Sequence, residues 1–428
     1  MNTTEIIVKS LEKLGIGAWI LTDVTEETAE LFFVKKQLDT RRIKDTHKYK
    51  VTVYRDETQG ETKLRGCTDT EILSSDTAEE IEKKLTDAFF AAQFAYNPYY
   101  DLPDAVQAPL VEKTGALAEA PLAESAGKMI EALFAPDNRA DAFLNSAEIF
   151  VIRNLTAIRT SEGTDVSYTS AKVKGEYVVQ CLEPEDVEMY HSFAYDECDA
   201  EALTKQVAES LDFVVDRAKA QKILKSGKYD LILCGEQLAE VLTYYGQRSH
   251  AQMLVSHYST WKPGDAVQGE TVTGEKLDLT FCATRPYNDE GIPMKDMSLI
   301  REGKLENIHG STQFCRYLGV APTGTYSKVR CENAGTESFA DMKKKPCLWA
   351  VTFSDFQMDA MSGHFGGEIR LAYLIDGEKA VPVTGGSING SILESQADLA
   401  FSTDRFTSSN YEGPYAVKMK DISVAGCD

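Results

Sequence analysis

Residues 148–181 read EIFVIRNLTAIRTSEGTDVSYTSAKVKGEYVVQC, and this stretch decides the fold class. It predicts two strands, Glu148–Arg159 and Val166–Cys181, with a turn at Glu162-Gly163 between them. A long helix is expected next, from about Glu201 to Lys225, with Gly227 as its C-terminal stop. Its apolar residues recur on one helical face: Leu203, Val207, Leu211, Val214 and Ala218. Paired strands followed by a helix indicate an α+β fold, with helices packed on an antiparallel sheet.

The residues upstream of this hairpin show the same mixture of elements. Thr77 and Glu80 form a capping box for a helix, and Pro121 is placed at the start of another. A further helix is expected over residues 6–14, ended by Gly15. The expected short strands are Ala18–Leu21, Leu31–Val34 and Tyr49–Tyr54.

The residues downstream are richer in strands, turns and glycine. Tyr229–Cys234 is typical of a buried strand, and a helix with Leu238, Val241, Leu242 and Tyr245 follows it. A hairpin is expected from Ile369 to Thr384, turning at Asp376-Gly377. We therefore expect an N-terminal α+β domain over residues 1–215, with subsegments of about 1–103 and 104–215, and a β-rich domain over 216–428.

Composition excludes several classes of function. The chain of 428 residues carries a formal net charge of −22, which disfavours binding to the phosphate backbone of nucleic acids. It lacks an apolar run of about 18 residues and a signal-like start, so neither a membrane span nor secretion is expected. Nine scattered cysteines without a CxxC pair are typical of reduced thiols. We expect a soluble cytoplasmic protein.

The stretch 236–256, taken as one helix, is the place to look for metal ligands. A zinc protease helix needs two histidines about one turn apart and a glutamate that activates water. Here His250 comes first, and His257 lies seven residues later, about 10.5 Å along a straight helix. One zinc ion cannot easily join the two, so a surface or partner-contact role is favoured. A spatial cluster among the other histidines remains open.

Three loops could line a cleft. Asp289, Glu290 and Gly291 place two carboxylates side by side, which suits metal binding or acid–base chemistry as well as simple turn formation. Thr323 and Gly324 form the second loop. Gly363, His364 and Gly366 form the third. The sequence carries neither a GxSxG elbow nor a phosphate-binding P-loop.

Several segments, in this order, resemble the TldD/PmbA family, also called modulators of DNA gyrase or peptidase family U62. The resemblance covers roughly residues 75–428. Its segments are 91–103, 148–153, YNDEGIP (287–293), LIREGKL (299–305), PTG (322–324), SGHFGGE (362–368), YLIDGE (373–378) and PVTGGSING (382–390).

The resemblance implies a two-chain metalloprotease that cleaves small or unfolded peptides. One subunit type carries a His-Glu-x-x-x-His zinc helix and a later cysteine ligand, whereas the PmbA (TldE) type lacks them. At the matching place this chain reads Glu240 to Gln247 without a histidine, and Cys427 is its penultimate residue. The family often has Asp where His364 stands. No catalytic, cofactor-binding or metal-binding residue is therefore assigned to this chain, and zinc is expected in the partner.

The leading hypothesis is a non-catalytic subunit that pairs with a zinc-bearing homologue and encloses peptides, with homodimers possible when it is alone. The residues expected at the peptide channel or partner surface are Asp289, Glu290, Gly291, Thr323, Gly324, Gly363, His364 and Gly366. One alternative is an autonomous metallopeptidase that uses His250, His257 or His364 with Asp289. The other is a regulatory binding protein without proteolytic activity.

Overall fold

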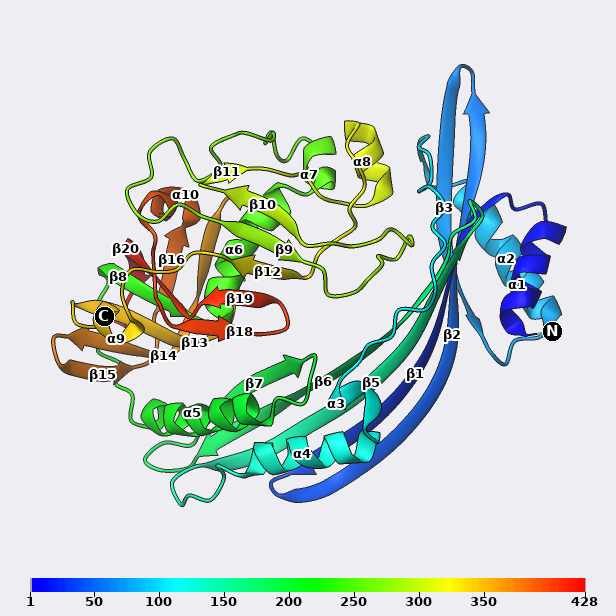
Figure 1. Ribbon diagram of the computed structural model, residues 1–428. Coiled ribbons are helices and arrows are strands. Elements are labelled where there is room, and N and C mark those ends of the chain that lie inside the picture. Colours follow the sequence, from blue (N-terminus) through cyan, green and yellow to red (C-terminus); the bar gives the residue numbers. More distant parts are fainter. Residues whose placement is uncertain (1, 428) are drawn as a thin grey trace.

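The computed structural model describes residues 2–427 (Figure 1). We refer to residues 2–218 as the N-terminal part and to residues 227–427 as the C-terminal part. The N-terminal part is built on a long, curved sheet, and the C-terminal part lies on its concave side (Figure 1). Helices and sheets are mixed, with strand outweighing helix, as expected for an α+β protein. Among residues 2–427 no helix is long and apolar enough to cross a membrane.

The curved sheet has seven strands in the order β4-β3-β2-β1-β5-β6-β7, and every neighbouring pair is antiparallel. The hairpin predicted from residues 148–181 is its β5–β6 pair, which is longer at the start than expected. The strands are β1 Ala18–Val34, β2 Gln37–Gln59, β3 Thr62–Leu73, β4 Tyr96–Pro98, β5 Phe143–Thr160, β6 Asp165–Cys181 and β7 Val187–Tyr195.

Two short strands expected at residues 18–21 and 31–34 are one continuous strand, β1. Its polar middle carries no apolar signal, yet Glu26 lies opposite Thr46 of β2 on one side and Asn154 of β5 on the other. Hydrogen bonds to β2 on one side and to β5 on the other thus keep the polar middle of β1 extended. From the sequence alone, this segment would be taken for a loop between two short strands. The strands β3 and β7 were not predicted.

The helices of the N-terminal part cover one face of the sheet. They are α1 Thr3–Lys13, α2 Ala78–Ala92, α3 Ala116–Glu119, α4 Leu122–Phe134 and α5 Ala200–Ala218. Leu21 of β1 packs in the core beneath α1 and α2, and Leu31, on the same face of β1, packs beneath α4 and α5. The capping box of Thr77 and Glu80 at α2 is confirmed. The opposite face of the sheet, which we call the open face, is directed toward the C-terminal part.

The predicted end of α5 was wrong. The helix ends at Ala218, and Gly227 begins the next strand instead of stopping the helix. The backbone of the intervening segment bonds across to the C-terminal part: Gln221 N donates to Pro382 O, and Gln221 O accepts from Thr384 N. These bonds occupy the backbone N–H and C=O of Gln221, which a longer helix would need for its own hydrogen bonds.

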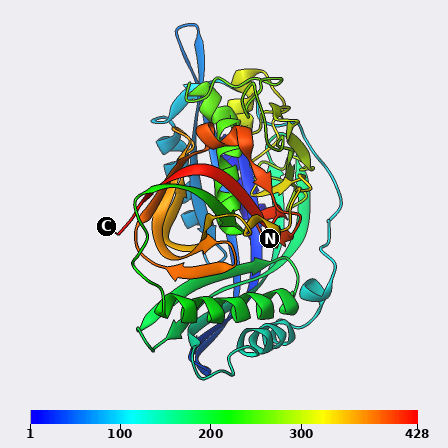
Figure 2. The ribbon, with the colours of Figure 1, turned by 90° about the vertical axis from the view of Figure 1, so that its left-hand side faces the viewer.

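The C-terminal part contains two sheets, which share one core with α6. Figure 2 shows α6 running through the middle of this part. One sheet has the order β11-β10-β9-β12-β19-β18, and the other has the order β13-β8-β20-β16-β14-β15, with β17 paired to β20. The strands are β8 Gly227–Cys234, β9 Leu279–Cys282, β10 Met297–Arg301, β11 Lys304–Leu305, β12 Lys328–Cys331, β13 Cys347–Met358, β14 His364–Asp376, β15 Lys379–Val383, β16 Ser387–Ser391, β17 Ala400–Phe401, β18 Arg405–Thr407, β19 Tyr411–Pro414 and β20 Ala416–Ala425.

The expected hairpin is the β14–β15 pair, in which Asp376 lies opposite Lys379 and Gly377 takes a φ of +62°. The helices of the C-terminal part are α6 Glu236–Arg248, α7 Ala251–Val255, α8 Thr312–Leu318, α9 Phe339–Met342 and α10 Ile392–Ser395, with a 3-10 turn at Gln396–Asp398.

The two parts touch at both ends of the curved strands. At one end, Tyr287 joins an apolar cluster with Ile20, Ile158 and Tyr168 of the open face. At the other end, Phe213 of α5 packs edge-on against Trp349 of β13, with ring centroids 5.9 Å apart. The C-terminal part is therefore attached to the curved sheet and its helices at two separate places.

Candidate functional site

The helix α6 occupies the place where the resemblance puts the zinc ligands of a catalytic subunit. It starts after Gly235, whose φ of +54° turns the chain sharply at the end of β8. Its inward side chains are apolar or aromatic, and Tyr245 donates a buried hydrogen bond of 2.8 Å to Gln396 Oε1. Glu240 accepts from the backbone N–H of Met358 at 3.3 Å. In this chain α6 therefore supports the core.

The expectation of one helix over residues 236–256 was wrong. The helix α6 ends at Arg248, and α7 begins separately after His250. The hydroxyl of Ser249 turns back to Tyr245 O at 2.8 Å, and His250 Nδ1 caps the new helix by accepting from Gln252 N at 3.2 Å. His257 follows α7 with a φ of +58°. The two histidines thus do not share one straight helix.

His250 lies instead beside His309, a pairing that the sequence did not indicate. Their ring centroids are 4.9 Å apart. His309 Nε2 donates to the carbonyl oxygen of Gly246 at 2.8 Å, and its buried Nδ1 has no partner among the described residues. Burial lowers the pKa of His309 to about 4 and also lowers the pKa of His250. Both rings are therefore neutral at pH 7.

These residues do not fit a zinc centre. Across residues 2–427 no group of three or more His, Cys, Asp or Glu side chains is arranged to hold a metal ion. A catalytic zinc needs three such ligands, and His250 and His309 supply two. Cys427, the last cysteine, places its Sγ 3.7 Å from the carbonyl oxygen of Thr384.

The loop with Asp289, Glu290 and Gly291 packs largely within the chain. Asp289 is 80% exposed and pairs with Arg285 at 2.5 Å. Glu290 Oε2 accepts from the hydroxyl of Thr312 at 2.9 Å and from its N–H at 3.1 Å, and burial raises its pKa. Gly291 has a φ of +79°, and a Cβ there would lie 2.7 Å from Thr164 Cγ2 at the end of the curved sheet. Asp289 is therefore the exposed member of this loop, and its carboxylate is paired with Arg285.

Thr323 and Gly324 lie beside this loop. A Cβ on Gly324, whose φ is +81°, would lie 2.8 Å from Asn288 Cβ. Thr323 Oγ1 accepts from Gly310 N at 3.2 Å. The structure thus brings together two of the three predicted loops.

Gly363, His364 and Gly366 belong to the other sheet. A Cβ on Gly363 would lie 3.0 Å from Leu393, and one on Gly366 would lie 2.7 Å from Ile388 O. His364 is exposed at the start of β14. The carboxylate near it is Asp359, whose pKa is lowered chiefly by the hydroxyl of Ser362 and in part by His364.

A large hollow between the two parts was not predicted from the sequence. A cavity of about 1220 Å³ lies between the two parts, and its walls come from β7, α5, the β8–α6 turn and residues 404–410. Three of its residues are His191 of β7, Gln206 of α5 and Glu236 of α6. They come from three different elements, which the tertiary fold brings to one cavity.

Comparisons with known proteins agree on one family. Residues 226–426 match the model of the PmbA/TldA metallopeptidase C-terminal domain. A metalloprotease TldD homologue of Haemophilus influenzae is 30% identical over 154 residues. That alignment covers 32% of this chain and 31% of the relative, so the chain spans about a third of the curated relative it matches.

Solved structures share the fold across nearly the whole chain. The crystal structure of TldE from Thermococcus kodakarensis has a TM-score of 0.76 at 15% identity and covers 97% of this chain and 100% of its own. A protein from Thermotoga maritima described as a modulator of a DNA gyrase has a TM-score of 0.76 at 14% identity, covering 99% of each chain. The match of residues 226–426 shows that the C-terminal part belongs to the PmbA/TldA metallopeptidase C-terminal domain family, and the fold of the chain as a whole is that of the TldE structure.

Proposed function

We propose that this chain is the non-catalytic partner of a zinc-bearing homologous subunit in a cytoplasmic protease that cleaves small or unfolded peptides. The observation that carries the proposal is α6. At the helix where the resemblance puts the zinc ligands, this chain has Glu240 to Gln247 without a histidine, and the inward residues fill a core. In this proposal the partner subunit binds the zinc ion, and this chain forms part of the wall of the peptide channel.

Room for a peptide supports this role. The cavity of about 1220 Å³ lies beside β7, which is one of the two edge strands of the curved sheet. Extended peptides bind readily at such edges through backbone groups. The exposed Asp289 and His364 remain our candidates for the channel or partner surface, together with the loops at 287–293, 323–325 and 362–367.

The test combines the purified chain with the zinc-bearing homologue from the same source. We expect peptide cleavage by the mixture and little by either chain alone, with zinc found by mass spectrometry only in the homologue. Replacing the homologue's zinc-binding histidines should abolish the activity of the mixture.

Three outcomes would overturn the proposal. Full activity of the zinc-bearing subunit alone would remove any need for this chain. Stoichiometric zinc in this chain alone would favour an autonomous metallopeptidase built on His250, His257 or His364 with Asp289. Capture of a different enzyme, without a zinc-bearing homologue, would favour a regulatory binding protein.

A further inference from the structure

The larger cavity is bordered by the edges of two sheets. The strand β7 is the last strand of the curved sheet, and β18 is the last strand of the six-stranded sheet of the C-terminal part. Residues 191–195 of β7 and residues 404–410, which include β18, line the cavity of about 1220 Å³. An edge strand presents every second backbone N–H and C=O group to its unpaired side. The cavity therefore offers backbone hydrogen bonds from two sheets.

A side-chain contact shows which backbone groups of β7 point outward. Ser192 O accepts a hydrogen bond of 2.9 Å from Gln206 Nε2 of α5, so this carbonyl group points away from β6. Backbone groups alternate in direction along a strand, so the N–H and C=O of Ala194 point outward as well. Ala194 lines the cavity. An extended peptide at the usual strand spacing of about 4.8 Å would therefore pair with β7 at Ala194.

One wall of the cavity is a row of five aromatic rings, which we call the aromatic row. The ring centroids of Phe213 and Trp349 are 5.9 Å apart, and those of Trp349 and Phe339 are 5.1 Å apart. Tyr415 follows at 5.1 Å from Phe339, and Phe406 of β18 lies 6.2 Å from Tyr415. All five rings line the cavity and are half-buried. Aromatic surface left toward a cavity is typical of a site that buries an apolar group of a ligand.

The charged residues that precede Phe406 are engaged within the chain. Asp404 Oδ2 accepts a hydrogen bond of 2.6 Å from the backbone N–H of Phe339. Arg405 Nη1 donates to Asn333 O at 2.9 Å. Neither of these two side chains is needed by a ligand at the aromatic row, so recognition there depends on apolar contact.

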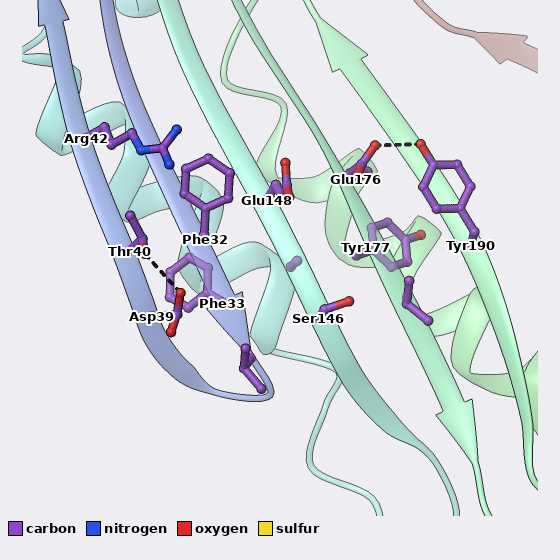
Figure 3. A pocket seen from close by; sticks show the side chains of 13 residues that line it. Phe32, Phe33, Asp39, Thr40, Arg42, Ser146, Glu148, Glu176, Tyr177 and Tyr190 are labelled. Atoms are coloured by element: carbon purple, nitrogen blue, oxygen red, sulfur yellow. Dashed lines mark hydrogen bonds between the residues drawn. The ribbon is translucent and has the colours of Figure 1, made fainter.

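A second hollow, on the open face of the curved sheet, offers a comparison. It has a volume of about 340 Å³ and extends from Phe32 past Glu148 to Tyr190 (Figure 3). Glu176 accepts a hydrogen bond of 2.7 Å from the hydroxyl of Tyr190 (Figure 3). Arg42 lies over the ring of Phe32 at 5.1 Å. Because charged groups stand beside its rings, this hollow suits an apolar side chain less well than the aromatic row does.

We infer that the larger cavity binds an extended peptide through backbone hydrogen bonds to β7 and through one large apolar side chain, such as phenylalanine or leucine, at the aromatic row. A strand beside β7 turns every second side chain toward the same face as Phe193 and Tyr195, which also line the cavity. Large apolar side chains are mostly buried in folded proteins, so this preference selects unfolded segments. The peptide role rests on the proposed function, whereas the recognition of a large apolar residue is new.

The test measures binding to the isolated full chain and needs no zinc-bearing subunit. The probes are fluorescein-labelled alanine–serine heptapeptides with blocked ends and a central phenylalanine, alanine or lysine, followed by fluorescence anisotropy. We expect the phenylalanine peptide to bind roughly tenfold more tightly than the other two, because burial of a phenyl ring is worth at least that much. Phe406→Ala should remove most of this difference. Ala194→Pro should weaken all three peptides, because it removes an outward N–H from the edge of β7.

Phe94→Ala is the matched control, since it removes a ring that is 75% exposed and does not line the cavity. It should leave the preference intact. A phenylalanine peptide with methylated backbone nitrogens keeps the ring but cannot donate to β7, and it should bind roughly tenfold more weakly. This comparison uses the unchanged chain, so it decides the question even where a substitution disturbs the fold.

Three results would overturn the inference. The first is binding of the alanine or lysine peptide as tight as that of the phenylalanine peptide, and the second is an equal loss of preference in Phe94→Ala. The third is binding of N-acetylphenylalanine amide as tight as that of the heptapeptide, which would assign the cavity to a small apolar ligand. Each result leaves the cleavage test of the mixed complex unaffected, so the two proposals fail separately.

Discussion

At the scale of a single residue, His309 should make the stability of the chain sensitive to acid. Burial lowers its pKa from 6.5 to about 4, so between these values the unfolded chain binds a proton that the folded chain does not. The contribution of His309 to the free energy of unfolding is therefore fully present above pH 6.5, and it is lost as the pH falls toward 4. We expect His309→Gln to reduce the acid destabilisation at pH 5 by about 2 kcal/mol. Urea unfolding at pH 7 and pH 5 measures this.

The control is His364→Gln, because His364 is exposed and its replacement removes no buried imidazole. An unchanged pH slope in His309→Gln would mean that the ring is not held neutral by burial. Sequence reasoning could not find this site. His250 and His309 meet through an isolated bridge between two loops, and neither residue stands in a pattern that indicates its partner.

At the scale of an element, the loop 287–293 depends on a close approach of backbone to the curved sheet. Gly291→Ala would add a Cβ 2.7 Å from Thr164 Cγ2 at a φ of +79°. Gly264→Ala is the matched control, because Gly264 has a φ of +97° but nothing within 4 Å. We expect both variants to lose about 1 kcal/mol from backbone strain, and Gly291→Ala to lose a further 1–3 kcal/mol from overpacking. Thermal unfolding measures the difference, and equal losses would contradict this contact.

The elements that sequence predicted well are those whose signal is local. The helix α2 was found from Thr77 and Glu80, and the β14–β15 hairpin from Asp376-Gly377, because a cap or a turn is set by neighbouring residues. The long strand β1 and the end of α5 were missed because long-range pairing decides them. Glu26 is held by strands on both sides, and Gln221 bonds to β15.

At the scale of the whole molecule, the sequence predicted neither of the two cavities. The larger cavity joins His191, Gln206 and Glu236 from three elements, and the smaller one joins Phe32, Glu148 and Tyr190 from three strands. The larger cavity depends on how the C-terminal part packs against the sheet and α5, and the smaller one depends on the register of the long strands. No spacing of residues within a short stretch of sequence indicates which distant elements come together in this way.

At one end of the curved strands, the contact between the sheet and the C-terminal part depends on Tyr287. Its side chain is 6% exposed, and its ring lies 6.4 Å from that of Tyr168, whereas Phe213 and Trp349 hold the other end independently. We therefore expect Tyr287→Ala to loosen one contact and to leave the other as a hinge, at a cost of about 3 kcal/mol.

Hydrogen exchange tests this by location. Amides of loop 287–293 and of α8 should exchange faster in Tyr287→Ala, while those of α5 and β14 should stay protected. Tyr258→Ala, at a tyrosine that is 56% exposed, should change neither region. If exchange rises equally at both ends, the two parts unfold as one unit and the cavity between them cannot open about a hinge. If it rises only near Tyr287, the sheet and the C-terminal part can separate enough to admit a peptide while α5 keeps them joined.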